Sequence, residues 1–385
     1  MPIFLGHLQN KPNLGINSLL QAAWPSHRVS IRPPRPAASS PTPPPMSQSR
    51  DDNRFDILRL LAAWLVLFSH CYPLSGRTAS EPLASTWGVD TLGGVGVAIF
   101  FVLSGYLVTL SLERSPHVLE FARRRALRIY PALVTLCLLC MLVLGPWMTT
   151  WPLAAYWQHP VTWDYLKTAS AWFIHYPLPG VFYDNPQPIT VNGALWSLPY
   201  EITCYGVLAL ASLLPGPLRF KVPLLGAGLV ALVLVRPADT VVGPFDLFVG
   251  MDYYHGKLGV LFALGAVFAC WRARIRPMLW PALVLLAGAL VLPHGAWQTL
   301  LYLLGVGTLT LWLALYARWL PRVPTRVGDW SYGAYLYGFP VQQVLAHYRL
   351  HELSFVGYIV ASTVITFALA GLSWHLVEKQ AMRWK

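Results

Sequence analysis

Two ionisable side chains in the apolar run 54–75 are placed where they could do chemistry. The run reads RFDILRLLAAWLVLFSHCYPLS, and Arg59 and His70 are 11 residues apart in it. An α-helix rises about 1.5 Å per residue with about 3.6 residues per turn, so both side chains are predicted on one face, about 16 Å apart along the axis. Charged groups in such runs usually face a bundle interior or a wet cavity. By themselves they fit equally a snorkelling arginine and a hydrogen-bonded core histidine.

A carboxylate in a later apolar run is a candidate partner for this histidine. Glu201, in the stretch NGALWSLPYEITCYG, is the only acid between residues 195 and 214. We expect Glu201 and His70 at similar depths in the outer half of a membrane. A carboxylate beside an imidazole fixes its tautomer and leaves the other nitrogen as a base. The alternative is a structural ion pair between two spans.

Arginines gather at the start of the third apolar run. The stretch FARRRALRIYP contains Arg123, Arg124, Arg125 and Arg128. Arg125 and Arg128 share a helix face because they are three residues apart. Guanidinium groups suit bidentate contacts to phosphate. Phosphate-binding arginines on one side and a histidine toward the other side predict a long, phosphorylated donor with a reactive far end, and Arg59 lies on the same face as the histidine, nearer the arginines.

The composition is that of a membrane protein. The 385 residues are 55% hydrophobic and only 11% charged, and mean hydropathy is +0.49, whereas soluble domains carry about 25% charged residues. The net charge of +12 comes from basic residues spread over short loops, which argues against nucleic-acid binding. The cysteines lie in or beside apolar runs, so we expect neither disulfides nor a metal site. They are Cys71, Cys137, Cys140, Cys204 and Cys270.

The apolar runs predict an all-α integral membrane protein with about ten transmembrane helices. The runs cover residues 55–74, 89–112, 128–146, 195–214, 221–236, 256–271, 278–293, 297–317, 331–348 and 354–376. Basic residues are concentrated in alternate loops, which places both termini in the cytoplasm. These loops and the C-terminus contain Arg114, Arg123, Arg124, Arg125, Arg219, Lys221, Arg272, Arg274, Arg276, Arg318, Arg322, Arg326, Lys379, Arg383 and Lys385.

Two segments stand apart from the predicted spans. Residues 1–50 are rich in Pro, Ser and Arg, which predicts a disordered tail or, with Met46 just before the first span, an over-extended start. The outer segment 147–194 is dense in tryptophan, which favours an interfacial aromatic belt, with a sugar-stacking lid as the alternative. The tryptophans in question are Trp147, Trp151, Trp157, Trp163 and Trp172.

Six short motifs occur in a fixed order. They are Arg59-x10-His70, Phe100-Phe101-x-x-Ser104-Gly105-Tyr106, Arg125-x-x-Arg128 followed by Pro131, Leu195-Trp196-Ser197-Leu198 leading to Glu201 and Tyr205, Trp330-Ser331-Tyr332-Gly333-Ala334-Tyr335-Leu336-Tyr337, and Glu378. Each motif is weak alone, but the ordered set over residues 51–382 resembles the membrane-bound acyltransferase-3 family of O-acyltransferases. Because no extracellular hydrolase-like domain follows the tenth run, the resemblance is to the stand-alone members.

The resemblance implies a role for each matching residue. His70 would be the essential catalytic histidine and Glu201 a supporting acid. Arg59, Arg125 and Arg128 would bind acyl-CoA, which is a co-substrate entering from the cytoplasm and not a permanently bound cofactor. Where the family often has histidine after Tyr-Leu-Tyr, this chain has Gly338. The residues expected to line the substrate pocket are Phe101, Ser104, Trp196, Tyr205 and Tyr335.

The sequence therefore predicts an O-acyltransferase of the bacterial inner membrane. It would move an acyl group, acetyl above all, from acyl-CoA to a hydroxyl of a cell-envelope carbohydrate or glycolipid. His70 would act as general base or as a nucleophile that carries the acyl group, and both routes stay open. The alternative is a proton-coupled or solute transporter, because intramembrane His, Glu and Arg also mark transport pathways. The lack of obvious inverted repeats and the arginines at one mouth favour the enzyme.

Overall fold

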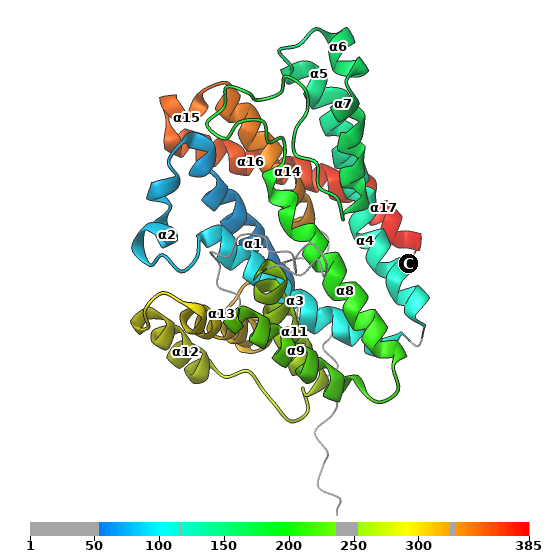
Figure 1. Cartoon of the computed structure of the whole chain (residues 1–385), viewed down its shortest axis with the longest axis vertical. Helices are drawn as coiled ribbons and strands as arrows, with labels where there is room; N and C mark the ends of the chain where they lie inside the picture. Colours follow the sequence, from blue (N-terminus) through cyan, green and yellow to red (C-terminus); the bar gives the residue numbers. More distant parts are fainter. Residues whose placement is uncertain (1–53, 116, 236–252, 324–328, 385) are drawn as a thin grey trace, which may run out of the picture. The chain divides into compact units, whose positions relative to one another are not determined.

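The computed structural model describes residues 54–115, 117–235, 253–323 and 329–384 (Figure 1). All regular elements in these ranges are helices, and the single extended pairing among them is an isolated bridge between Thr149 and Val181. The all-α prediction is confirmed for this part of the chain. The tail predicted at residues 1–50 lies outside the described residues.

A helix occupies each of the predicted apolar ranges. These helices are α1 (Arg54–His70), α3 (Leu92–Arg114), α4 (Val118–Leu139), α8 (Leu198–Leu213), α9 (Leu218–Val235), α11 (Tyr253–Cys270), α12 (Leu279–Val291), α13 (Ala296–Tyr316), α14 (Ser331–His347) and α16 (Phe355–Ser373). Among the described residues, six segments are long and apolar enough to cross a membrane, and they contain α1, α3, α4, α9, α13 and α16. The count of about ten spans and the cytoplasmic placement of both termini remain predictions.

Short elements connect these helices. The α-helical ones are α2 (Pro82–Thr86), α5 (Gly145–Met148), α6 (Leu153–Gln158), α7 (Pro160–Asp164), α15 (Leu350–Leu353) and α17 (Lys379–Ala381). The 3-10 and π turns are η1 (Pro73–Ser75), η2 (Thr78–Ser80), η3 (Cys140–Leu144), η4 (Tyr165–Ser170), η5 (Gly193–Ser197), η6 (Trp374–Glu378) and η7 (Met382–Trp384).

Helix α3 is the centre of the bundle and packs against α1, α11 and α13. Glycines allow backbones to approach closely here, as the sequence of α3 predicts. A Cβ atom added to Gly105 would lie 2.0 Å from the carbonyl oxygen of Phe262 in α11, and one added to Gly96 would lie 2.5 Å from the carbonyl oxygen of Ala62 in α1. The α1–α3 contact is therefore tight, and polar cavities open along it on either side of this packing.

The connection from α5 to α8 is folded against the bundle. Tyr156 and Tyr165 are fully buried in it. Asn185 donates to the carbonyl oxygen of Gln343 in α14 at 2.9 Å, and Asn192 donates to the carbonyl oxygen of Leu336 at 2.9 Å. These bonds fix the approach of the chain to η5 and α8, where the predicted site residues lie. The aromatic belt predicted for this segment stays a prediction.

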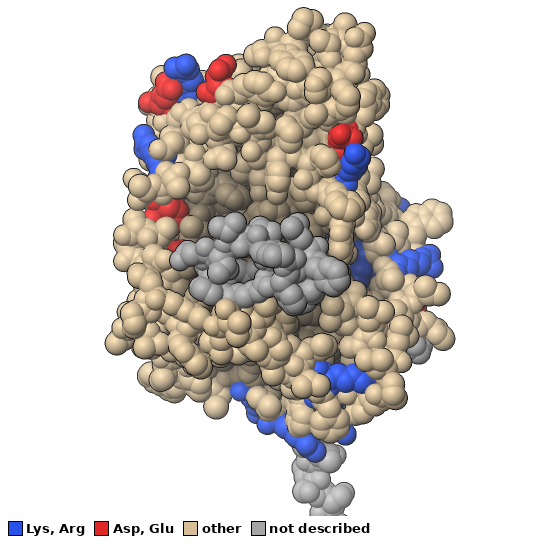
Figure 2. Space-filling view, in the orientation of Figure 1, with Lys and Arg blue, Asp and Glu red and all other residues tan. Residues whose placement is uncertain are grey.

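The outside of the bundle is strongly apolar. Large apolar side chains are exposed along several helices, among them Leu142, Val143, Leu210, Val284, Val291, Val360 and Val364. Most of the face in Figure 2 carries neither basic nor acidic side chains. A soluble monomer rarely exposes apolar patches of this extent, whereas lipid tails cover them in a bilayer.

Candidate active site

Two polar cavities lie along the contact between α1 and α3. The larger has a volume of about 240 Å³ and contains His70; we call it the histidine cavity. The smaller, of about 80 Å³, contains Arg59, Arg125 and Arg128; we call it the arginine cavity. Val97 and Tyr335 line both cavities. Arg59 and His70, predicted about three turns apart on one face of α1, therefore line one cavity each.

His70 is the last residue of α1, and its ring faces the histidine cavity. Phe339 in α14 packs edge-on against the imidazole, with ring centroids 5.3 Å apart. Within the described chain no group forms a hydrogen bond with either ring nitrogen. Neither nitrogen is completely shielded from solvent. A ring that is held by packing and open at its nitrogens is suited to accept a proton or an acyl group.

An ion pair that the sequence analysis missed lines the same cavity. Lys257 in α11 lies 3.0 Å from a carboxylate oxygen of Asp90, just before α3, and both side chains are largely buried. The two residues are 167 positions apart in the chain, so no local sequence pattern predicts their contact. Glu81 was also missed. It accepts hydrogen bonds from Ser69, the neighbour of His70, at 3.0 Å and from the backbone N–H of Leu92 at 2.7 Å.

Two aromatic rings line the histidine cavity beside the start of α8, and a third ring, that of Tyr200, packs behind them. Trp196 and Tyr254 line the cavity. The ring of Trp196 lies 5.0 Å from that of Tyr254 and 5.9 Å from that of Tyr200, centroid to centroid. The sequence analysis expected Trp196 in the pocket, but not the two tyrosines. Aromatic faces of this kind suit the apolar faces of a sugar ring.

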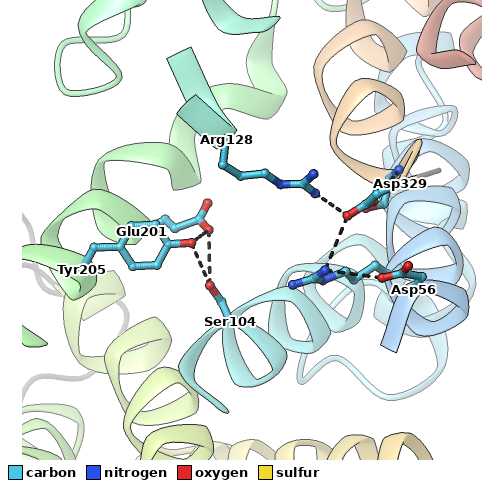
Figure 3. A network of polar contacts seen from close by, with 8 residues as sticks. Asp56, Ser104, Arg128, Glu201, Tyr205 and Asp329 are labelled. Atoms are coloured by element: carbon cyan, nitrogen blue, oxygen red, sulfur yellow. Dashed lines mark hydrogen bonds and ion pairs between the residues drawn. The ribbon is translucent and has the colours of Figure 1, made fainter. Parts of the chain in front are cut away.

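Arg59 and Arg128, which line the arginine cavity, belong to a charged network beside it (Figure 3). Asp329, just before α14, forms an ion pair with Arg128 in α4. It forms a second one with Arg59 in α1, whose Nη1 lies 3.4 Å from the same carboxylate oxygen. Arg59 also lies 3.6 Å from Asp56. Burial raises the pKa of Asp329, but the charges of Arg128 and Arg59 and the bond from Ser331 outweigh it and lower this pKa to about 2. Asp329 was not predicted, because it lies 201 residues from Arg128.

Arg125 is the arginine that remains available in this cavity. It lines the cavity beside Arg128, as the shared helix face predicts. In the described part of the chain its Nε is shielded from solvent without a hydrogen-bond partner. Such a buried orphan donor costs about 1–3 kcal/mol, and a phosphate or other anion entering the cavity would satisfy it. Phe101 and Ser104 in α3 lie on the opposite wall.

Only two of the four arginines predicted to cluster, Arg125 and Arg128, line the arginine cavity. Arg124 pairs with Glu120 and donates to Ser115 at 2.9 Å. Arg123 is exposed and donates to the carbonyl oxygen of Trp384 at 2.6 Å. Neither lines the arginine cavity. Residues 123 and 124 point away because they lie on other faces of α4 than residues 125 and 128.

Glu201 and His70 do not form the predicted pair. Glu201 accepts a hydrogen bond from Tyr205 and a long one, 3.4 Å, from Ser104, and it lines the arginine cavity (Figure 3). Ser104 lies 10 residues along α3 from Gly94, which lines the histidine cavity. At about 1.5 Å per residue, Ser104 and Gly94 are about 15 Å apart along α3. Glu201 does not line the histidine cavity, although Val97 and Tyr335 line both cavities.

Glu201 lies near the start of α8, which begins at Leu198, three residues after the start of the predicted span. Asn192 caps the turn η5 by accepting from the N–H of Ala194 at 3.2 Å, and Pro199 fits the first turn of α8. Glu201 is therefore in the first helical turn, where a carboxylate is favoured by the helix dipole.

Tyr335 in α14 separates the two cavities. Its hydroxyl donates to the carbonyl oxygen of Ala194 and shares a hydrogen bond of 2.9 Å with Ser197. Four predicted pocket residues line the arginine cavity, namely Phe101, Ser104, Tyr205 and Tyr335. Tyr335 also lines the histidine cavity, together with the fifth, Trp196. Gly338 lines neither cavity. A Cβ atom added to it would lie 3.6 Å from the Leu67 side chain.

Comparison with known proteins gives the class of the molecule. A family model described as an acyltransferase domain matches residues 52–375. The chain belongs to this acyltransferase-3 family and is an acyltransferase, as the ordered motifs predicted. No solved structure matches the chain.

Individual relatives cover most of the chain. It is 32% identical over 336 residues to the O-acetyl transferase of Shigella phage Sf6, which covers 85% of this chain and 95% of the relative. It is 31% identical over 365 residues to nodulation protein 10 of Rhizobium leguminosarum bv. viciae, covering 86% and 93%. Similarity to the exopolysaccharide production protein ExoZ of Rhizobium meliloti (strain 1021) is 28% over 264 residues, covering 64% and 76%.

Proposed function

We propose that this acyltransferase moves an acyl group, acetyl above all, from acyl-CoA in the arginine cavity to a hydroxyl of a cell-envelope carbohydrate in the histidine cavity. The observation that carries the proposal is the arrangement of the two cavities. One contains an arginine with an unsatisfied donor, the other contains a histidine with open nitrogens, and Val97 and Tyr335 line both. The relatives named for O-acetyl transfer and exopolysaccharide production support the reaction and the acceptor class.

In the proposed reaction His70 removes the proton of the acceptor hydroxyl. The oxygen attacks the thioester carbonyl, the new C–O bond forms, the C–S bond breaks, and CoA leaves as its thiol after receiving a proton. In the other route the imidazole attacks first and carries the acyl group to the acceptor. Arg125 and Arg128 contact donor phosphates, Arg59 helps to hold Asp329, and Glu201 positions Tyr205 and Ser104 beside the donor.

The proposed orientation places the arginine cavity toward the cytoplasm, where acyl-CoA is made, in a bacterial inner membrane. The arginine cavity opens beside the N-terminal part of α4, and the loops assigned to the cytoplasm carry the excess of basic residues. A donor with a long flexible arm suits this arrangement, since its phosphates and thioester must span about 16 Å along α1.

Turnover in liposomes tests the function. The reconstituted chain should release CoA thiol from acetyl-CoA supplied on one side only, and only when a pool of envelope glycans is present, with acetyl label appearing on the glycan. If label or glycan crosses the membrane without ester formation, the chain is a transporter of the kind considered as the alternative. No acetyl-CoA binding at all would also overturn the proposal.

Replacing Arg125 by methionine should weaken donor binding by about 10-fold to 100-fold, because hydrogen bonds to charged groups contribute about 1.5–3 kcal/mol each. The measurement is equilibrium binding of a non-transferable thioether analogue of acetyl-CoA to the purified chain. Arg123→Met removes an equal charge from the same helix outside the cavity and serves as the control. Equal affinities of the two variants would contradict the donor role of Arg125.

A further inference from the structure

A large apolar groove lies between α8, α9 and α11, beside the candidate site. These helices are neighbours in the bundle (Figure 1). The groove has a volume of about 580 Å³ and is walled by Val207, Leu208, Leu225, Leu232, Phe262 and Ala263 among others. A volume of this size is in the range of small-molecule sites.

The groove opens toward lipid. Leu224 and Val207 at its edge are 75% and 43% exposed. Helix α9 is the least buried of the six long apolar helices. A side-entry groove with apolar walls in a bilayer takes a hydrocarbon chain, because burying apolar surface is favourable and no polar group in it needs a partner.

At one end the groove lies beside the histidine cavity. Tyr200 lines the groove, and its ring lies 5.9 Å from Trp196 and 6.3 Å from Tyr254, both of which line the histidine cavity. Phe262 in the groove wall packs against Tyr205 of the arginine cavity, with ring centroids 6.1 Å apart. A chain in the groove therefore leads past aromatic rings to His70.

From the apolar groove and its position beside the histidine cavity we infer that the acceptor is a lipid-linked carbohydrate whose hydrocarbon tail lies in the groove between α8, α9 and α11. Its sugar then stacks on Trp196, Tyr200 and Tyr254 and presents a hydroxyl to His70. The pair of Lys257 and Asp90 faces the same cavity and supplies polar contacts to the sugar. This inference rests on the proposed function for the hydroxyl and the acyl transfer, but the tail site itself is independent of catalysis.

Two glycines make a matched test. Gly228 in α9 lines the groove, and Gly206 in α8 does not. A Cβ atom added at either position meets no atom within 4 Å, and both residues are exposed. Phenylalanine at position 228 would project into the groove without a clash in the fold, and phenylalanine at position 206 would extend into lipid elsewhere.

The experiment uses the full chain in lipid nanodiscs and hexadecyl glucoside carrying a photoreactive diazirine in its tail. We expect labelled peptides from residues 198–213, 218–235 and 253–270, and loss of label with excess plain hexadecyl glucoside. Gly228→Phe should lower labelling about 10-fold, equal to about 1.4 kcal/mol, while Gly206→Phe should not. Melting curves of both variants check that they fold.

Three results would overturn the inference. They are full labelling of the Gly228→Phe variant, equal competition by methyl glucoside, which lacks a tail, or equal labelling by a diazirine phosphatidylcholine that hexadecyl glucoside does not displace. The last result would mean that the groove holds ordinary bilayer lipid. Labelling that persists in His70→Ala, with transfer lost, separates tail binding from catalysis, so failure of one leaves the other standing.

Discussion

Replacing His70 by alanine should lower acyl transfer about 1000-fold, within the range of about 100-fold to 10,000-fold attributed to general acid–base groups. The reason is structural as well as chemical. His70 is the only histidine that lines either polar cavity in the described chain. Its nitrogens are open, and Phe339 fixes its ring. The measurement is release of CoA thiol from acetyl-CoA in the presence of envelope glycans.

Donor binding separates loss of chemistry from loss of fold in the His70 variant. Affinity for the thioether analogue should be unchanged, because His70 lines the histidine cavity and does not line the arginine cavity. Added imidazole should restore part of the activity, since the histidine cavity has about 240 Å³ of space before the ring is removed. Turnover of the alanine variant at the wild-type rate would exclude both routes through His70.

Replacing Asp329 by asparagine should lower the free energy of unfolding by about 3–5 kcal/mol, the cost of leaving a buried charge without its partner. Asp329 is 8% exposed and neutralises Arg128 and Arg59 together. Asparagine keeps the shape and can still accept from the N–H of Ser331, so the lost charge is the main change. The measurement is thermal or denaturant unfolding of the chain in detergent.

An exposed ion pair gives the matched control for Asp329. Glu352 lies 3.5 Å from Arg349, and the two side chains are 53% and 75% exposed. Its replacement by glutamine should change stability by less than about 1 kcal/mol. The double variant Arg128→Met with Asp329→Leu should recover much of the stability lost in Asp329→Asn, because no unpaired Arg128 remains. Equal unfolding curves for Asp329→Asn and Glu352→Gln would contradict the role of the network.

The sequence located the helices and the faces of the key side chains. Apolar runs of about 20 residues can be read directly, and helical periodicity placed Arg59 with His70 and Arg125 with Arg128 before any contact was known. The ordered motifs identified the family, and the match of the family model to residues 52–375 confirms it.

The contact partners of the site residues could not be predicted from the sequence in the same way. The contacts of Glu201 depend on where α8 begins, and that depends on η5 and on the bonds that hold the preceding connection to α14. The error placed Glu201 beside His70, whereas it lies with Ser104 and Tyr205.

By itself the sequence determined an all-helical acyltransferase with His70 and the arginines on predictable helix faces, because helix periodicity and hydrophobicity are local properties. Only the tertiary structure decided which charges meet. Asp329 with Arg128, Lys257 with Asp90, and Tyr335 between two cavities join residues more than 130 positions apart. Such contacts depend on how helices pack, and packing is set by the whole bundle and not by any one segment.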